Sequence, residues 1–88
     1  MISIILTYYK KKNFIKRCLD SIVDQTYRNF EVIMVYDDDE KEDLKYIKKI
    51  SKKISRFKII INKKNIGVAK SRNIALKNSK GKYIAFLD

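Results

Sequence analysis

Residues 30–43, FEVIMVYDDDEKED, join a mostly apolar run to a dense group of acids. A nearly continuous apolar run of about seven residues is typical of a strand that is covered on both faces, as in a parallel sheet. Further apolar runs occupy residues 2–6 (ISIIL), 57–61 (FKIII) and 83–87 (YIAFL). The sequence therefore predicts four strands, and we expect the last of them to be buried.

Amphipathic patterns separate the four runs and predict three helices. Apolar residues recur at helical spacing over residues 14–23, 44–54 and, more weakly, 68–76. Gly81 follows the third pattern and can close the turn before the last strand. Strands that alternate with helices in this way call for right-handed crossovers. The predicted fold class is therefore α/β, a doubly wound, mostly parallel sheet with the order β-α-β-α-β-α-β in a single domain.

The net charge of +11 is unevenly distributed. Residues 45–88 hold 14 lysines and arginines against one acid. Such a basic region can hold phosphates or anionic lipid head groups. However, 17 of the 21 cations are lysines, which favours a solvated surface over bidentate phosphate contacts. The single cysteine, Cys18, excludes an internal disulfide, and we expect a cytoplasmic protein.

The residue types exclude several kinds of site. With no histidine and one cysteine, the sequence has neither a His/Cys zinc site nor a histidine-based catalytic triad. The only two glycines, Gly67 and Gly81, fit neither the dinucleotide-binding motif G-x-G-x-x-G nor a P-loop. Aromatic, hydroxyl and carboxylate side chains remain as the candidates for chemistry.

Ligands of doubly wound sheets bind outside the carboxyl ends of the strands, so the residues that follow each strand are candidates. Thr7 and Tyr9 follow the first strand, and Asp37 follows the second. Tyr9 could lie against a flat base while Thr7 and Asp37 hydrogen-bond its edge. Arg72 could face a diphosphate, and Asp88, after the fourth strand, could hold a ribose hydroxyl or a divalent cation. Together these residues predict a nucleoside diphosphate site.

Each of these residues also has a purely structural interpretation. Tyr9 could pack against its neighbours, and Arg72 could be a solvated surface cation. The acids at positions 39, 40, 42 and 43 suit the N-terminal turn of the next helix, where carboxylates interact favourably with the helix dipole.

Three stretches carry a resemblance to a known family, QTYRNFE (25–31), NIGVAKSRN (65–73) and GKYIAFLD (81–88). In order and spacing, the chain resembles the N-terminal, nucleotide-sugar-binding half of the family 2 glycosyltransferases over essentially its whole length. The resemblance implies a Rossmann-like nucleotide-diphospho-sugar transferase half-domain. It also implies inverting transfer of a sugar from a nucleotide-sugar donor, such as a UDP-sugar, to a saccharide or lipid-linked acceptor in cell-surface polysaccharide or glycolipid synthesis.

The resemblance assigns roles to the candidate residues by position. Thr7 and Tyr9 are similar to the residues that hold the base, and Asp37 to the carboxylate that accepts from the base N–H. Arg72 matches an arginine near the nucleotide. Asp88 is similar to the first acid of the D-x-D motif, whose acids contact ribose and a divalent cation, Mn²⁺ or Mg²⁺. Residues 1–88 would then be the N-terminal part of the domain, incomplete at the C-terminus and without a catalytic base, and we expect them to be inactive alone.

Two other interpretations stay open. The basic half could belong to a module that binds nucleic acid or an anionic membrane, although no recognition motif supports nucleic acid as a partner. The chain could also be a non-catalytic remnant whose apolar last strand favours self-association. For a glycosyltransferase, we expect a cytoplasmic location with peripheral association at the inner face of the membrane.

Overall fold

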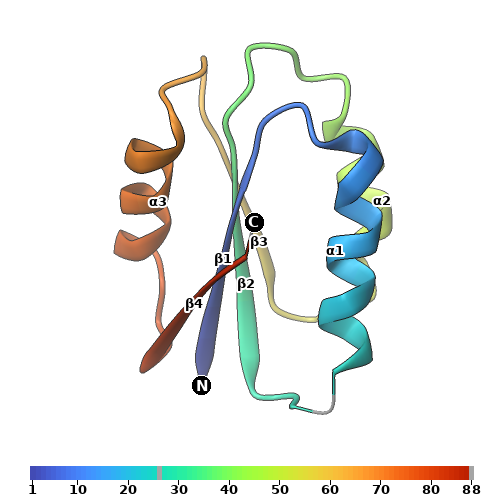
Figure 1. The fold of residues 1–88 in the computed structure, drawn as a ribbon, viewed down its shortest axis with the longest axis vertical. Coiled ribbons are helices and arrows are strands. Elements are labelled where there is room, and N and C mark those ends of the chain that lie inside the picture. Colours follow the sequence, from blue (N-terminus) through green and yellow to red (C-terminus); the bar gives the residue numbers. More distant parts are fainter. Residues whose placement is uncertain (26, 88) are drawn as a thin grey trace.

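Strands and helices alternate along the chain, as the sequence predicts (Figure 1). The computed structural model describes residues 1–25 and 27–87. The strands are β1 (Ile2–Tyr8), β2 (Phe30–Tyr36), β3 (Phe57–Ile61) and β4 (Tyr83–Leu87). The helices are α1 (Lys12–Asp24), α2 (Leu44–Ile50) and α3 (Val68–Lys77). The predicted order of elements is confirmed, and β2, β3 and β4 have the predicted bounds.

The four strands form one parallel sheet in the order β3-β2-β1-β4. Ile2 of β1 lies opposite Phe30 of β2 on one side and opposite Tyr83 of β4 on the other. The chain therefore runs outward from β1 to β3 and then crosses back past β1, which makes the sheet doubly wound. Because the strands are parallel, the loops that follow β1, β2 and β3 meet at one edge, at the top of Figure 1. The predicted fold class is confirmed.

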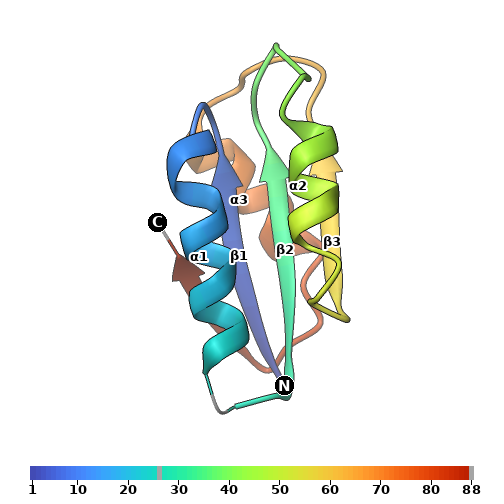
Figure 2. The same cartoon turned by 90° about the vertical axis from the view of Figure 1, so that its right-hand side faces the viewer.

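Helices cover both faces of the sheet, with α1 and α2 on one side and α3 on the other (Figure 1 and Figure 2). The larger core lies under α1 and α2, and its buried residues are Ile4, Leu6, Tyr8, Ile15, Leu19, Ile22, Val32, Met34, Tyr36, Ile47 and Ile54. The smaller core lies under α3 and consists of Ile5, Ile33, Val35 and Ala75. Successive residues of β1 and β2 thus face different cores, which explains why both strands are apolar at nearly every position.

The second helix is shorter than predicted. α2 ends at Ile50, and turns continue the chain, with the Ser51 N–H bonded to the carbonyl of Ile47 at 3.0 Å. Ile54 is buried all the same, so the apolar spacing extends past the helix. The acids that precede Asp43 lie in the loop before α2, and the prediction that they occupy its first turn is wrong. In the described part of the chain, no helix is long and apolar enough to cross a lipid bilayer.

The fourth strand is exposed, and the prediction that it is buried is wrong. Tyr83 is 62% exposed and Phe86 is 51% exposed. β4 is an edge strand that pairs with β1, and the described elements leave much of both its faces uncovered. An apolar run indicates a strand, but whether its faces are covered depends on elements elsewhere in the fold.

A polar cluster at the amino edge of the sheet fixes the start of β4 against β1. The Ser3 hydroxyl donates to Glu31 Oε2 at 2.5 Å and accepts from the Gly81 N–H at 2.8 Å. Burial acts to raise the pKa of Glu31, but hydrogen bonds from Ser3 and the backbone N–H of Lys80 outweigh it and hold that pKa below its usual value. A Cβ at Gly81 would lie 2.6 Å from the backbone nitrogen of Ser3, so this close approach requires glycine.

Candidate functional site

A pocket of about 380 Å³ lies where the loops after β1, β2 and β3 meet. Its lining residues are Thr7, Tyr9, Lys11, Asp37, Asn65, Gly67 and Val68. Three of the predicted site residues, Thr7, Tyr9 and Asp37, are therefore brought together from two strand ends. This is the edge at which doubly wound sheets bind ligands.

Two adjacent tyrosines, the last residue of β1 and the residue after it, lie in different surroundings. Tyr8 is buried, its ring stacks on that of Tyr36 with centroids 5.0 Å apart, and its hydroxyl donates to Asp43 Oδ2 at 2.7 Å. Burial, followed by the neighbouring Asp43 carboxylate, raises the pKa of Tyr8 well above its usual value. Tyr9 is 47% exposed, so much of its ring is open to solvent or to a ligand at the pocket.

Asp37 is buried, and its carboxylate accepts four hydrogen bonds from the loop after β3. Oδ1 accepts from the side chain of Asn62 at 3.0 Å and from the Ile66 N–H at 2.7 Å. Oδ2 accepts from the side chain of Asn65 at 3.2 Å and from the Gly67 N–H at 3.0 Å. Burial acts to raise the pKa of Asp37, but these donors outweigh it and hold that pKa below its usual value.

Asp37 therefore organises the wall of the pocket. A carboxylate offers about four lone-pair sites, and the donors from residues 62–67 occupy that number. The predicted hydrogen bond from a base N–H to Asp37 stays a prediction. Such a bond would require the base N–H to replace one of the four protein donors.

Neighbouring residues hold the same loop in place. The Asn65 N–H donates to Asp39 Oδ1 at 2.7 Å. The Lys41 ammonium donates to the carbonyl of Asn62 at 2.6 Å and also to the carbonyl of Asp38. Gly67 has a φ of 97°, a conformation that disfavours residues with a side chain, so glycine is required where the loop enters α3. Asp37 and Asp39 of the acidic stretch, together with Lys41, thus position the loop after β3.

Several pocket residues were not predicted. Lys11 lies at the pocket and its ammonium donates to the carbonyl of Thr7 at 3.2 Å. Its position just after the first strand was a usable signal, because ligands bind beyond strand ends. Asn65 and Val68 come from a loop whose path depends on the donors to Asp37, and no local sequence pattern reveals that dependence.

The other two predicted site residues do not line the pocket. Arg72 lies on α3, one turn beyond Val68, and its guanidinium carbon is 5.3 Å from the centre of the Phe86 ring. Asp88 lies outside the described residues. The structure thus places Thr7, Tyr9 and Asp37 at one pocket and Arg72 farther along α3.

A divalent cation has no complete site among the described residues. Within residues 1–25 and 27–87, no three His, Cys, Asp or Glu side chains are grouped so that they could hold a metal ion. The Asp37 carboxylate is engaged by N–H donors, which a cation would have to displace.

Solved structures of glycosyltransferases have the same fold. The crystal structure of S. aureus TarS 1-349 has a TM-score of 0.88 and 30% sequence identity, over 99% of this chain and 26% of that one. A second structure of that protein is a complex with UDP-GlcNAc. A mannosyltransferase from Pyrobaculum calidifontis, in complex with GDP-Man and Mn²⁺, has a TM-score of 0.85 at 21% identity, over 94% of this chain and 25% of that one, and shows likeness of fold alone.

Curated relatives match over the full length of the chain. Two Escherichia coli proteins, WfaP and WfgD, are 42% and 38% identical over 88 residues, and each is a UDP-Glc:alpha-D-GlcNAc-diphosphoundecaprenol beta-1,3-glucosyltransferase. The chain covers 34% of each of these proteins. It covers 27% of an uncharacterized Haemophilus influenzae glycosyltransferase that is 39% identical to it. This chain thus spans about a third or less of these relatives.

A family model places these similarities in one family. The model of glycosyl transferase family 2 matches residues 3–88, which include the ends of β1 and β2 and the whole of α3. The resemblance inferred from residues 25–31, 65–73 and 81–88 is therefore confirmed. The chain belongs to glycosyl transferase family 2.

Proposed function

We propose that the chain binds a UDP-sugar and forms the donor-binding part of an inverting glycosyltransferase. Its acceptor would be the hydroxyl of a saccharide or of a lipid-linked saccharide in cell-surface polysaccharide or glycolipid synthesis. The observation that carries the proposal is the pocket at the carboxyl edge of the sheet, where Thr7 and Tyr9 face the loop that Asp37 holds. TarS, which binds UDP-GlcNAc, and the two UDP-Glc-dependent E. coli enzymes support the choice of donor.

The pocket offers a surface for a base. The exposed Tyr9 ring can stack on uracil, and such stacking of a base on an aromatic ring contributes about 1–3 kcal/mol. The Thr7 hydroxyl and the side-chain carbonyl of Asn65 are polar groups at the same pocket that can pair with the edge of the base. Asp37 would take part in base binding chiefly by holding Asn65 in place.

Two cations can balance the charge of the diphosphate. The Lys11 ammonium has three donors, one of which is used by the carbonyl of Thr7, so others remain for phosphate oxygens. Arg72 lies one turn farther along α3. A divalent cation, Mn²⁺ or Mg²⁺, belongs to the same proposal with Asp88 as a ligand, because hard cations prefer carboxylate and phosphate oxygens. That ion would offset the charge of the leaving diphosphate.

The proposal also covers the cellular location of the protein and the activity of the 88-residue chain alone. A lipid-linked acceptor would require a cytoplasmic protein that associates peripherally with the inner face of the membrane. Because the chain covers only 34% of the E. coli relatives, we expect the 88-residue polypeptide to bind donor without transferring sugar.

Isothermal titration of the 88-residue chain with UDP, UMP and GDP tests the proposal. We expect UDP to bind, UMP to bind more weakly because it lacks the second phosphate, and GDP to bind more weakly because the proposed donor is a UDP-sugar. A separate incubation with UDP-glucose, followed by analysis of released UDP, should show no turnover. A folded chain that fails to bind UDP with and without Mn²⁺, or that binds all three ligands equally, would refute the proposal.

A further inference from the structure

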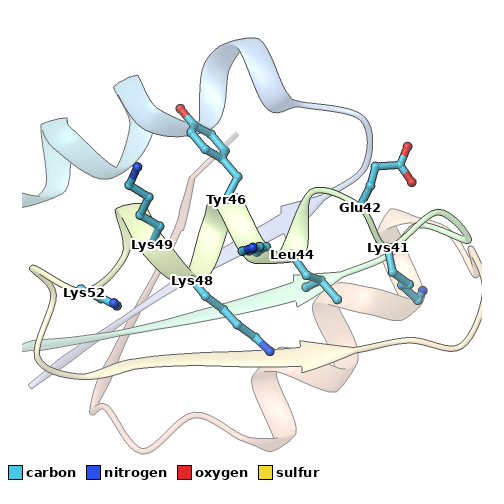
Figure 3. Close-up of a pocket in the computed structure, with 8 residues that line it drawn as sticks. Lys41, Glu42, Leu44, Tyr46, Lys48, Lys49 and Lys52 are labelled. Atoms are coloured by element: carbon cyan, nitrogen blue, oxygen red, sulfur yellow. The ribbon is translucent and has the colours of Figure 1, made fainter.

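The outer face of α2 and of the turn after it carries four lysines, Lys45, Lys48, Lys49 and Lys52, which we call the α2 lysine stripe. Their spacing of i, i+3, i+4 and i+7 places them on one side of the helix. Ile47, on the opposite side, is buried against the sheet. Figure 3 shows the side chains of Lys48 and Lys49 extending away from the backbone of α2.

No acid of residues 1–25 and 27–87 neutralises the stripe. Among the described residues, none of its four lysines forms an ion pair within 4.0 Å, whereas Lys53 close by is paired with Asp20. Like charges three or four residues apart destabilise a helix, and α2 is only 7 residues long. The stripe therefore costs stability in the free protein, and a polyanionic partner would relieve that cost.

The surroundings of the stripe suit a lipid surface. The lysines border an open hollow of about 860 Å³ that also includes Leu44, Tyr46 and Lys41, with Glu42 as its one acid among the described residues. The ammonium of Lys12, from α1, lies 5.6 Å from the centre of the Tyr46 ring and adds a further cation. Tyrosine is favoured at membrane interfaces, where its ring is apolar and its hydroxyl stays wet.

We infer that the α2 lysine stripe docks the protein on an anionic lipid bilayer, with Tyr46 at the level of the lipid head groups. Lysine is a point charge on a flexible stem, which suits the diffuse field of an anionic surface, whereas base readout favours the planar fork of arginine. The purpose of this docking rests on the proposed function, because it would bring the donor pocket close to a lipid-linked acceptor. The surface itself is independent of UDP binding.

Vesicle sedimentation of the 88-residue chain tests the inference. The probes are vesicles of phosphatidylcholine alone and of phosphatidylcholine with an equal amount of phosphatidylglycerol, at about 0.1 M salt. We expect binding to the anionic vesicles only. Replacing all four stripe lysines by glutamine should weaken that binding about a hundredfold or more, since each lysine near such a surface is worth roughly a fivefold change in affinity.

A charge-matched variant serves as the control. Lys70, Lys77, Lys80 and Lys82 are exposed and lie on α3 or in the segment that follows it, across the sheet from α2. Their replacement by glutamine removes the same charge, and we expect less than a tenfold loss, because the Debye length at this salt is about 10 Å. Circular dichroism and UDP titration of both variants separate loss of docking from loss of the fold or of the donor site.

A fluorescent reporter locates the contact. The chain has no tryptophan, so Tyr46→Trp and Tyr83→Trp each introduce one, on α2 and on β4. Anionic vesicles should shift the emission of the first variant to the blue and leave the second unchanged. Equal losses in the two lysine variants, a shift at position 83 alone, or double-stranded DNA binding tighter than vesicle binding would overturn the inference.

Discussion

The backbone N–H of Gly67 donates a hydrogen bond to Oδ2 of Asp37 across 3.0 Å, which ties the start of α3 to the end of β2. Asn62, Asn65 and Ile66 donate to the same carboxylate. One buried side chain therefore orders the loop that forms a wall of the candidate donor pocket. Stability and ligand binding should respond together when this carboxylate is altered.

Replacing Asp37 by asparagine should lower the free energy of unfolding by about 2–3 kcal/mol. The amide would present N–H groups to donors that now face a carboxylate, and a buried donor left without an acceptor costs about 1–3 kcal/mol. Urea denaturation would measure the change. Asp39→Asn is the matched control, because exposed Asp39 accepts one hydrogen bond from the loop, and we expect a cost below about 1 kcal/mol. Equal stabilities of the Asp37 variant and the unaltered chain would contradict the role of Asp37 in holding the loop.

The stability that Asp37 provides should depend on pH in a defined direction. Its pKa in the folded chain is below its usual value, which is about 3.9 in an unfolded chain. The folded state therefore binds its proton less readily, so the stabilisation is complete above about pH 5 and is lost as the pH falls through 3.9 and then through the folded pKa. The difference in urea midpoint between the unaltered chain and Asp37→Asn should shrink over this range. A difference that stays constant down to pH 2 would contradict this assignment.

The fold could be predicted from the sequence largely because β1 and β2 are buried on both faces. Such strands must be apolar at nearly every position, so runs such as residues 30–36 are visible without any tertiary information. The same rule failed for β4, whose run is apolar although its faces are exposed. The apolar spacing also could not place the end of α2, because Ile54, which follows the turn after the helix, continues that spacing.

Replacing Gly81 by alanine should destabilise the chain by roughly 3 kcal/mol, the upper end of typical overpacking costs. The new Cβ would lie 2.6 Å from the backbone nitrogen of Ser3 and 2.9 Å from the carbonyl carbon of Ile2, so β4 would have to move away from β1. Thermal and urea unfolding would measure the loss. Adding Ser3→Gly should not restore stability, because the closest contacts that remain are to backbone atoms.

Gly67→Ala offers a contrast with the change at Gly81. A Cβ at Gly67 would meet no atom within 4 Å, but the φ of 97° is unfavourable for alanine. We expect a cost of about 1–2 kcal/mol from backbone strain alone. UDP titration of the same variant should show weaker binding, since Gly67 lies at the pocket. Unchanged stability would mean that the loop can relax to another conformation.

The candidate site was only partly predictable, for a physical reason. Thr7 lies at the end of β1, and Tyr9 and Asp37 directly follow strands. Parallel strands bring their ends to one edge, so local sequence was sufficient to place these residues together. The hydrogen bonds from residues 62–67 to Asp37 join segments about 25 to 30 positions apart. Such pairing depends on the path of a loop, which leaves no periodic pattern in the sequence.

Replacing Lys10 by asparagine should stabilise the chain by about 0.5–1 kcal/mol. Lys10 has a φ of 51°, in the left-handed region that asparagine tolerates better than lysine. Lys10→Ala is the control, because it removes the same charge and the exposed contact with Glu40 without relieving the backbone. A urea midpoint that rises equally in both variants would point to the loss of charge as the cause.

Replacing Tyr9 by alanine should weaken UDP binding about tenfold or more, because the exposed ring is the stacking surface of the proposed donor site and such stacking is worth about 1–3 kcal/mol. Tyr9→Phe keeps the ring and should bind UDP nearly as well as the unaltered chain. Tyr27→Ala removes another exposed tyrosine, which precedes β2 and so lies at the opposite edge of the sheet, and it should leave UDP binding unchanged. Calorimetric titration of the three variants would decide. If Tyr9→Ala binds UDP normally, the base must bind elsewhere, since removal of a stacking ring cannot be neutral to a base that lies on it.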